Sequence, residues 1–352
     1  MRIAVVGATG NVGTSLLEAL AAEPAVDSIV GIARRRPTLE RDKVEWASAD
    51  IRRAELAPLF RGADAVVHLA WAIQPSHNPA LLHATNVEGS RRVFRAVAEA
   101  GVPALVYASS VGAYSAGPKD RRVDETWPTE GIPSSFYGRH KAAVERLLDR
   151  FEREQPQVRC VRLRPGLIMK RESASEQRRY FAGPLFPGAL ARRGLIPVVP
   201  NVKRLAVQLV HASDVAQAYR LALTGEARGA FNIAAEPVLD APALARLLGA
   251  RLVPLPAAAL RAATALSWRL RLQPTPSGWV DLALGVPLLD WSRARRELGW
   301  EPRRSSAEAL LEVLAGLREG AGGATPPLAR RAGGRVRERE LRSRVGGRGD
   351  PG

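Results

Sequence analysis

The stretch "RIAVVGATGNVGTSLLEALAAE", residues 2–23, constrains the fold more than any other part of the chain. Its apolar start fits a buried strand, and a helical pattern follows directly. Gly7, Gly10 and Gly13 lie at the junction, where glycine permits a tight turn and close approach of an anion to the backbone. The helix N-terminus adds a positive dipole. Three glycines alone would indicate only a turn, but in this context they predict a dinucleotide-binding loop.

Short apolar runs continue to alternate with helical patterns through the first 166 residues. Such alternation predicts an α/β fold, with a Rossmann-type, doubly wound parallel sheet covered by helices on both faces. After residue 166 the pattern loosens, and residues 205–235 restore it with a strand, a helix and a further strand. The strands expected in the first part are 2–7, 28–33, 44–50, 63–71, 104–110 and 158–166, and the helices are 11–23, 53–60, 81–101 and 136–154.

These patterns predict three parts. Residues 1–166, with 205–235 returning to them, should form an NAD(P)-binding Rossmann domain. Residues 167–204 and 236–320 should form a smaller, mainly helical substrate-binding part. Residues 321–352 hold eight arginines against three acids and few apolar residues, which predicts a disordered, basic, Gly- and Arg-rich tail.

The net charge of +17 raises the question of nucleic acid, but no helix-turn-helix, zinc-finger or RNP-type pattern accompanies it. Nucleic-acid binding is therefore an unlikely role, with the tail as its only candidate. No apolar run approaches the ~18 residues of a membrane span, and the start of the chain does not resemble a secretory signal. The single cysteine, Cys160, fits a reducing cytoplasm, and the scattered histidines predict no metal site.

The segment "SSFYGRHKAAVERLL", residues 134–148, places Tyr137 and Lys141 on one helix face. We expect Arg139, Glu145 and Arg146 to be solvated or at an interface. The chain has 47 arginines but only five lysines, so a lysine here suggests a specific chemical need. A nearby ammonium lowers the pKa of a phenol, which lets it exchange a proton with a carbinol. Ser110 ends the strand 104–110 and could hold the substrate oxygen. Ordinary packing of Tyr137 and a turn at Ser109 and Ser110 remain alternatives.

The end of the second strand bears on the cofactor. Folds that bind NAD usually have an acid there for the ribose 2′-hydroxyl, but this chain has Ala33 followed by Arg34 and Arg35. Guanidinium groups suit a 2′-phosphate, so we expect NADP or NAD, with NADP favoured. A solvated arginine run would give the same pattern. Asp50 lies where an acid could accept from the adenine amino group.

Together these features resemble the extended short-chain dehydrogenase/reductase family, including its NAD-dependent epimerase/dehydratase group, over about residues 1–315. "ADAVVHLAW" resembles the family's VxHLAA strand, "TNVEGSRRVFRAVAEAGV" its NVxGTxN helix, "YGRHK" its YxxxK signature and "ARRELGWEP" its ARxxLGWxP segment. The resemblance implies an enzyme, an NAD(P)-dependent oxidoreductase or epimerase acting on a small molecule. Four positions before Tyr114, the resemblance selects Ser110 over Ser109 as the catalytic serine.

The motifs and the resemblance together give the expected site. The catalytic residues are Tyr137, Lys141 and Ser110. The cofactor-binding residues are Gly7, Thr9, Gly10, Asn11, Val12, Gly13, Arg34, Arg35, Asp50, Ile51, Leu69, Ala70, Trp71, Asn86, Tyr137, Lys141 and Pro165.

Departures from the family pattern bear on the substrate. Nucleotide-sugar members carry an arginine where this chain has Val207, and Arg204 lies three residues earlier. Val111 and Gly112 follow Ser110 where sugar 4,6-dehydratases have an Asp-Glu pair, which argues against a dehydratase. Residues 171–206 carry four large apolar or aromatic side chains that favour either a less polar substrate or ordinary packing; they are Tyr180, Phe181, Leu185 and Phe186.

Two alternative functions remain open at this point. One is a nucleotide-sugar epimerase, and the other is a non-catalytic NAD(P)-binding sensor, against which the retained YxxxK signature argues. A homodimer through the helices that carry Asn86 and Tyr137 is possible by analogy with the family.

Overall fold

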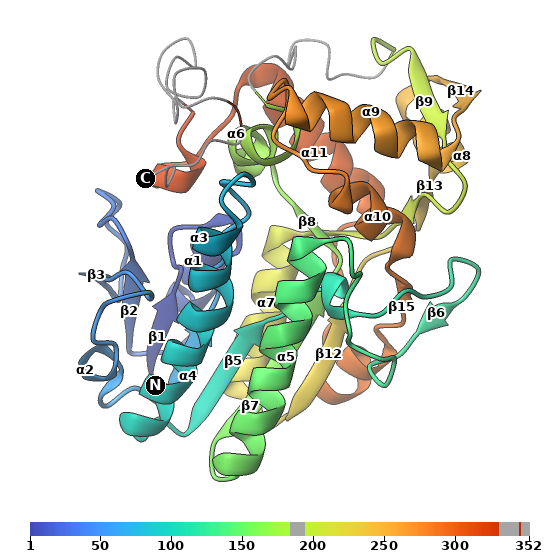
Figure 1. Ribbon diagram of the computed structural model, residues 1–352. Coiled ribbons are helices and arrows are strands. Elements are labelled where there is room, and N and C mark those ends of the chain that lie inside the picture. The colour runs from blue at the N-terminus through green and yellow to red at the C-terminus, as the bar shows by residue number, and fades with distance from the viewer. Residues whose placement is uncertain (184–193, 331–344, 346–352) are drawn as a thin grey trace.

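The computed structural model describes residues 1–183, 194–330 and 345. Its centre is a sheet of seven parallel strands in the order β12-β7-β5-β4-β1-β2-β3 (Figure 1). The chain starts in the middle of the sheet, runs outward to β3, and crosses back to β4. This confirms the predicted Rossmann-type sheet. The strands are β1 (Arg2–Val6), β2 (Ser28–Ala33), β3 (Val44–Ser48), β4 (Ala65–His68), β5 (Ala104–Ala108), β7 (Arg159–Pro165) and β12 (Gly229–Ile233).

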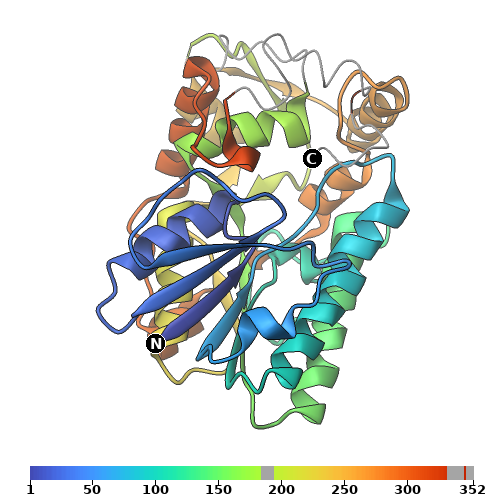
Figure 2. The same ribbon diagram turned by 90° about the vertical axis from the view of Figure 1, so that its left-hand side faces the viewer.

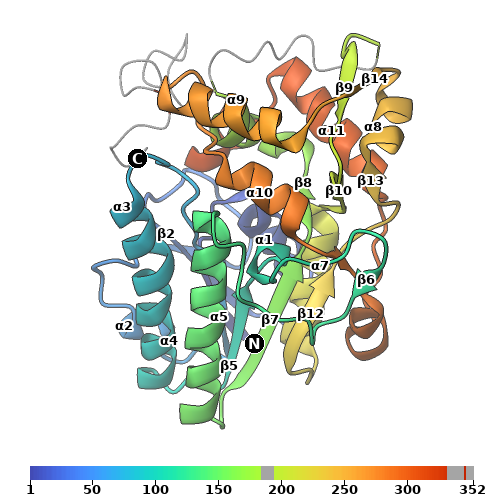
Figure 3. The same cartoon turned by 45° about the vertical axis from the view of Figure 1, so that its right-hand side comes forward.

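Helices cover both faces of this sheet. The helices α1 (Asn11–Ala21) and α7 (Ala212–Thr224) lie on one face, and α4 (Gly89–Glu99) and α5 (Phe136–Glu154) lie on the other (Figures 2 and 3). Each face has its own apolar core, because the central strands are covered by helices on both sides and bury side chains on both faces. The short helix α2 (Ala57–Phe60) packs near α4.

Two predicted helices differ from the structure. The expected helix 81–101 consists of α3 (Pro79–His83), a π-helical turn (Ala84–Glu88) and α4. The expected helix 53–60 is only the short α2, which has Pro58 in its first turn, where a proline is tolerated. The helix expected at 136–154 is α5, which begins where the Ser135 side chain accepts the N–H of Gly138 at 3.3 Å.

The remaining elements form a smaller part beyond the carboxyl ends of the parallel strands (Figure 1). Four pairs of short strands connect it internally and to the sheet domain: β8 (Leu167–Met169) with β11 (Leu209–His211), β9 (Val198–Asn201) with β14 (Arg251–Pro254), β10 (Ala206–Val207) with β13 (Leu239–Asp240), and β6 (Arg122–Val123) with β15 (Leu288–Leu289). Its helices are α6 (Ala174–Gln177), α8 (Ala241–Leu248), α9 (Ala257–Arg269), α10 (Gly278–Gly285) and α11 (Ser306–Glu319).

The segment after α11 differs from the disordered tail that we expect for 321–352. Residues 321–330 fold back onto the sheet domain, with a 3-10 turn at Pro326–Leu328. The Thr325 hydroxyl is buried and donates to the Thr9 carbonyl oxygen at 2.7 Å. Ala321, Thr325 and Leu328 are shielded from solvent, which gives this segment a small core contact that its Gly-rich composition does not reveal. Residues 331–344 and 346–352 of the tail lie outside the described residues.

Candidate active site

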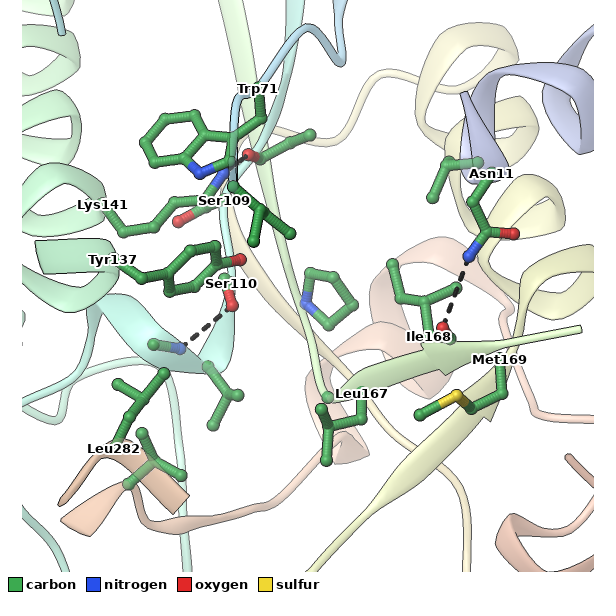
Figure 4. Close-up of a pocket in the computed structure, with 18 of the residues that line it drawn as sticks. Asn11, Trp71, Ser109, Ser110, Tyr137, Lys141, Leu167, Ile168, Met169 and Leu282 are labelled. Atoms are coloured by element: carbon green, nitrogen blue, oxygen red, sulfur yellow. Dashed lines mark hydrogen bonds between the residues drawn. The ribbon is translucent and has the colours of Figure 1, made fainter. Parts of the chain in front are cut away.

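A deep cleft lies between the carboxyl edge of the parallel sheet and the smaller part. Strands β1, β4, β5 and β7 end on one side of it, and α10 with the segment after β8 forms the other side (Figures 1 and 4). Eleven of the predicted site residues line this cleft: Gly7, Gly10, Asn11, Val12, Gly13, Leu69, Trp71, Ser110, Tyr137, Lys141 and Pro165. Ligands bind at this edge in doubly wound folds.

The fold of the loop at one end of the cleft requires glycine at positions 7 and 13. Gly7 has a φ of +90°, and a Cβ there would lie 2.6 Å from the Ala70 nitrogen. A Cβ at Gly13 would lie 2.5 Å from the Gly7 carbonyl oxygen. Gly10 precedes α1 without any side-chain cap, so the first N–H groups of that helix remain available to an anion. The loop therefore fits the pyrophosphate of a dinucleotide.

Tyr137 lies at the other end of the cleft, on the first turn of α5. Its side chain and the Ser110 side chain point toward one another (Figure 4). The Ser110 hydroxyl accepts the N–H of Gly112 at 3.0 Å. A Cβ on Gly112 would lie 2.7 Å from the Tyr137 ring, so only glycine leaves room for the ring at this position. Burial raises the pKa of Tyr137 to about 12, and the neighbouring Ser110 side chain offsets only part of that effect.

Lys141 lies one turn further along the same face of α5. Its ammonium donates to the Ala108 carbonyl oxygen at 2.7 Å and lies 3.6 Å from the centroid of the Trp71 ring. Burial lowers the pKa of Lys141 to about 7. We expect the ammonium to lower the pKa of Tyr137. In this structure burial has the larger effect, and it raises the pKa of Tyr137 and lowers that of Lys141. The phenol therefore stays protonated unless a further positive charge comes close.

Ser109 and Ser110 have different partners, which distinguishes their roles. The Ser109 hydroxyl donates to a Glu145 carboxylate oxygen at 2.5 Å, away from Tyr137. The Ser110 side chain is the one that points toward Tyr137 in the cleft (Figure 4). The geometry thus supplies a physical reason for choosing Ser110, in addition to its position in the motif.

Glu145 corrects a prediction drawn from the sequence. The pattern suggests a solvated or interfacial glutamate, but its side chain is 0% exposed. It accepts from Arg164 on β7 at 2.9 Å through each carboxylate oxygen and from Arg162 at 2.8 Å. Burial would raise its pKa, but these guanidinium groups hold it well below its usual range. Glu145 therefore fastens the helix of Tyr137 to the sheet.

Asn86 lies behind the cleft wall instead of lining the cleft. Its amide accepts the Ala72 N–H at 2.7 Å, donates to the Ala72 carbonyl oxygen at 2.8 Å, and lies 3.4 Å from the nearer ring nitrogen of His140. These bonds fix the loop after β4, which carries Trp71. Thr9, Ala70 and Ile51, also predicted as cofactor residues, are not among the cleft-lining side chains.

The residues predicted to distinguish NADP from NAD follow the carboxyl ends of β2 and β3. Arg34 and Arg35 are exposed where β2 ends. Asp50 pairs with Arg52 at 2.6 Å, and this hydrogen bond lowers the pKa of Asp50. Its carboxylate is thus already engaged, which reduces its capacity to bind an adenine amino group.

The cleft wall beyond Tyr137 includes residues that the sequence does not single out. Trp279, Leu282 and Val286 come from α10 and the residue after it. No motif marks α10, because its apolar residues are typical of an ordinary core.

The apolar segment after residue 171 contributes to the same wall. Tyr180 and Phe181 line the cleft. Leu185 and Phe186, for which the sequence leaves substrate contact and ordinary packing open, lie outside the described residues.

Two negative findings apply to the described part of the chain. It contains no group of three or more His, Cys, Asp or Glu side chains arranged to hold a metal ion. None of its helices combines the length and apolar character needed to cross a bilayer.

The cleft of this parallel sheet has an anion-binding glycine loop at one end and a buried tyrosine near a lysine at the other. These features define a Rossmann-fold protein built around a dinucleotide cofactor. Comparison with known families gives the same class. The model of the NAD dependent epimerase/dehydratase family matches residues 3–234, so the chain belongs to this family, among the extended short-chain dehydrogenases/reductases.

Individual relatives are more distant. An uncharacterized protein of Mycobacterium tuberculosis is 27% identical over 321 residues, which cover 90% of this chain but 30% of that protein. The chain thus spans less than a third of the length of that relative. The sterol-4-alpha-carboxylate 3-dehydrogenase of Saccharomyces cerevisiae is 29% identical over 180 residues, or 51% of this chain and 45% of that enzyme.

Solved structures share the fold. The UDP-glucose 4-epimerase of Thermus thermophilus, solved in complex with NAD, superposes with a TM-score of 0.66 over 90% of this chain and 99% of that one, at 22% identity. This likeness supports the architecture, and the chemistry must be argued from the side chains of this chain.

Proposed function

We propose that the protein transfers hydride between a secondary carbinol, or the corresponding ketone, and an NAD(P) cofactor, with Tyr137 as acid/base. The observation that carries the proposal is that the Tyr137 and Ser110 side chains point toward one another in the cleft, with Lys141 on the same helix face (Figure 4). Family membership and the glycine loop support the cofactor.

The cofactor, when bound, supplies the hydride acceptor or donor and, in its oxidised form, a positive charge. In oxidation the carbinol C–H bond breaks and its electron pair leaves with the hydrogen, while the O–H proton passes to Tyr137 in its phenolate form. The Ser110 hydroxyl oxygen already accepts the Gly112 N–H, so its own O–H is left to donate to the substrate oxygen and hold it. Lys141 stabilises the phenolate form of Tyr137 and is held by the Ala108 carbonyl.

The experiment that tests this role compares two tyrosine variants. NADPH and NADH are titrated into the purified protein, and a panel of ketones and secondary alcohols follows with the preferred cofactor. Tyr137→Phe should abolish turnover and leave cofactor affinity nearly unchanged, because the ring stays in place. Tyr107→Phe is the matched control, since the Tyr107 hydroxyl is buried without a partner and lies outside the cleft lining. Unchanged turnover in Tyr137→Phe would refute the assignment.

We also propose that the cofactor is NADP, although NAD alone is implied by the name of the family. The support is electrostatic: β2 ends in Ala33 without an acid, and Arg34 and Arg35 follow. Replacing both arginines by serine should weaken NADPH binding by roughly tenfold and leave NADH binding unchanged. Arg53→Ser, on the next loop, controls for net charge. Equal losses for both cofactors would contradict the preference.

A further inference from the structure

The cleft beyond Tyr137 is walled by apolar side chains. The centroids of the Trp279 and Tyr137 rings are 4.9 Å apart, and Phe181 meets Trp279 edge-on at 5.0 Å. Leu282 and Val286 pack into the same cluster. Figure 4 shows Leu282 next to Tyr137 and Ser110, on the side away from Asn11 and the glycine loop. A substrate whose oxygen reaches Tyr137 must therefore place its body against aromatic and aliphatic surface.

Two cations next to α10, Lys119 and Arg204, donate to backbone carbonyl oxygens. The Lys119 ammonium donates to the Ala206 and Ala283 carbonyls at 2.8 and 3.0 Å, and burial lowers its pKa to about 8. The Arg204 guanidinium donates to the Gly117 and Leu284 carbonyls at 2.6 and 3.2 Å. Arg204 thus does not take the place of the arginine that nucleotide-sugar members carry at the position of Val207. Among the described residues that line the cleft, the charged side chains are Lys141 and Glu176.

The polar side chain in this wall is also engaged. Gln208 accepts the Leu289 N–H at 2.7 Å and donates to the Leu289 carbonyl oxygen at 3.2 Å. Its amide is therefore bonded to the protein backbone and has little hydrogen-bonding capacity left for a ligand. A diphosphate in this part of the cleft would lose its hydration without gaining a cation from the described residues.

We infer that the substrate is an apolar ring alcohol, or the corresponding ketone, that carries one reacting oxygen and no phosphate. This inference rests on the proposed hydride transfer. The ring system packs against the face of α10 that carries Trp279 and Leu282, where burial of apolar surface drives binding. In the forward direction the ring C–H hydrogen leaves with its electron pair to oxidised NAD(P), the O–H proton passes to Tyr137 in its phenolate form, and the ring carbon becomes a ketone carbon.

A pair of probes tests this inference: the bicyclic ketone 1-decalone and UDP-glucose. 1-Decalone is titrated by calorimetry into the protein saturated with the reduced cofactor, and UDP-glucose into the protein saturated with the oxidised cofactor, because UDP-glucose has carbinols to oxidise and no ketone to reduce. The change in the redox state of the cofactor is then followed optically for each probe. 1-Decalone should bind and oxidise the cofactor, and excess UDP-glucose should not displace it. Tighter binding of UDP-glucose, its displacement of 1-decalone, or failure of 1-decalone to bind would each overturn the inference.

Variants in the wall give a second readout. Trp279→Ala should raise the KM for 1-decalone at least tenfold, change kcat little, and leave cofactor affinity intact. Val207→Arg should act in the same direction, because it places a cation in the apolar wall. Trp268→Ala is the matched control, since Trp268 stacks on His77 outside the cleft lining. An unchanged KM in both wall variants would contradict the inference.

Failure of this inference can be distinguished from failure of the proposed function. If UDP-glucose is turned over and Tyr137→Phe abolishes that turnover, the substrate class is wrong and the role of Tyr137 stands. If turnover of either probe survives Tyr137→Phe, the proposed function itself fails.

Discussion

Glu145 shows how a single residue connects the candidate catalytic helix to the sheet. It lies four positions after Lys141, as Lys141 lies four positions after Tyr137, so all three share one face of α5. Its carboxylate binds Arg162, Arg164 and Ser109 inside the protein. A buried carboxylate between two guanidinium groups is stable only as a complete cluster.

Glu145→Gln should lower the free energy of unfolding by about 3 kcal/mol, because it leaves two buried guanidinium groups without their shared carboxylate. Urea denaturation measures this change. Glu154→Gln, at the exposed last turn of the same helix, should change it by less than about 0.5 kcal/mol. Equal effects of the two substitutions would show that the buried cluster contributes no more than a surface charge.

The sequence predicted the residues of the catalytic face unevenly. Tyr137 and Lys141 were identifiable because lysine is scarce and their spacing fits one helix face. Glu145 was assigned to the surface because a charged residue on a helix usually faces water. A signal was present: the strand "VRCVRLRPG" carries arginines in an otherwise buried run, and buried arginines need a carboxylate partner.

At the scale of elements, the N-terminus of α1 sets the anion site. Gly10 has a φ of −77°, which any residue can adopt, and a Cβ there would lie 3.6 Å from its nearest contact. Glycine is therefore not required at position 10 by the fold. The space in front of the helix is kept open, which fits a role in binding.

Gly10→Asp separates folding from binding. Aspartate is a good N-cap, so the melting temperature should stay the same or rise slightly. Cofactor affinity should fall by roughly a hundredfold, because the new carboxylate occupies the anion site. Gly13→Ala is the contrasting variant, and it should lower the melting temperature, since its Cβ would meet the Gly7 carbonyl oxygen at 2.5 Å. Intact cofactor affinity in Gly10→Asp would refute the assignment of the loop.

Element prediction succeeded where local periodicity is strong. The alternation of apolar runs and helical patterns predicts the sheet. The pairing of the short strands cannot be predicted in the same way, because β6 with β15 and β10 with β13 involve two residues on each strand. Their partners are far apart in sequence, and no periodicity develops over so few residues. The apolar wall of α10 was missed for a related reason, since only tertiary packing brings it to Tyr137.

At the scale of the whole molecule, the segment 321–330 links the end of the chain to the start of the cofactor cleft. The Thr325 hydroxyl donates to the Thr9 carbonyl oxygen inside the glycine loop, and Leu328 is 1% exposed. The segment therefore supports the loop from outside the cleft.

Two truncations test this contact. A chain ending at residue 320 should have a lower melting temperature and weaker cofactor affinity than a chain ending at residue 330, because it loses the buried contacts of Thr325 and Leu328. Differential scanning calorimetry and cofactor titration measure both effects. Identical values for the two chains would show that the segment adds nothing to the loop. A test of RNA binding by the basic tail should likewise begin its deletion after residue 330.

The central claim is that the cleft brings a positively charged cofactor to Tyr137, and ionisation of the tyrosines tests it without a known substrate. Burial raises the pKa of all five tyrosines in the free protein, to about 12 for Tyr114 and Tyr137. No phenolate should therefore form below about pH 10. An oxidised nicotinamide next to Tyr137 stabilises the phenolate and lowers that pKa.

The measurement is the phenolate absorbance in the near ultraviolet, followed against pH with and without saturating oxidised cofactor. The account predicts that one tyrosine ionises at a lower pH when NADP or NAD is bound, and that Tyr137→Phe abolishes this transition. The uncharged reduced cofactor should produce a smaller change. An identical titration with and without the oxidised cofactor, once its binding is established, would contradict the account.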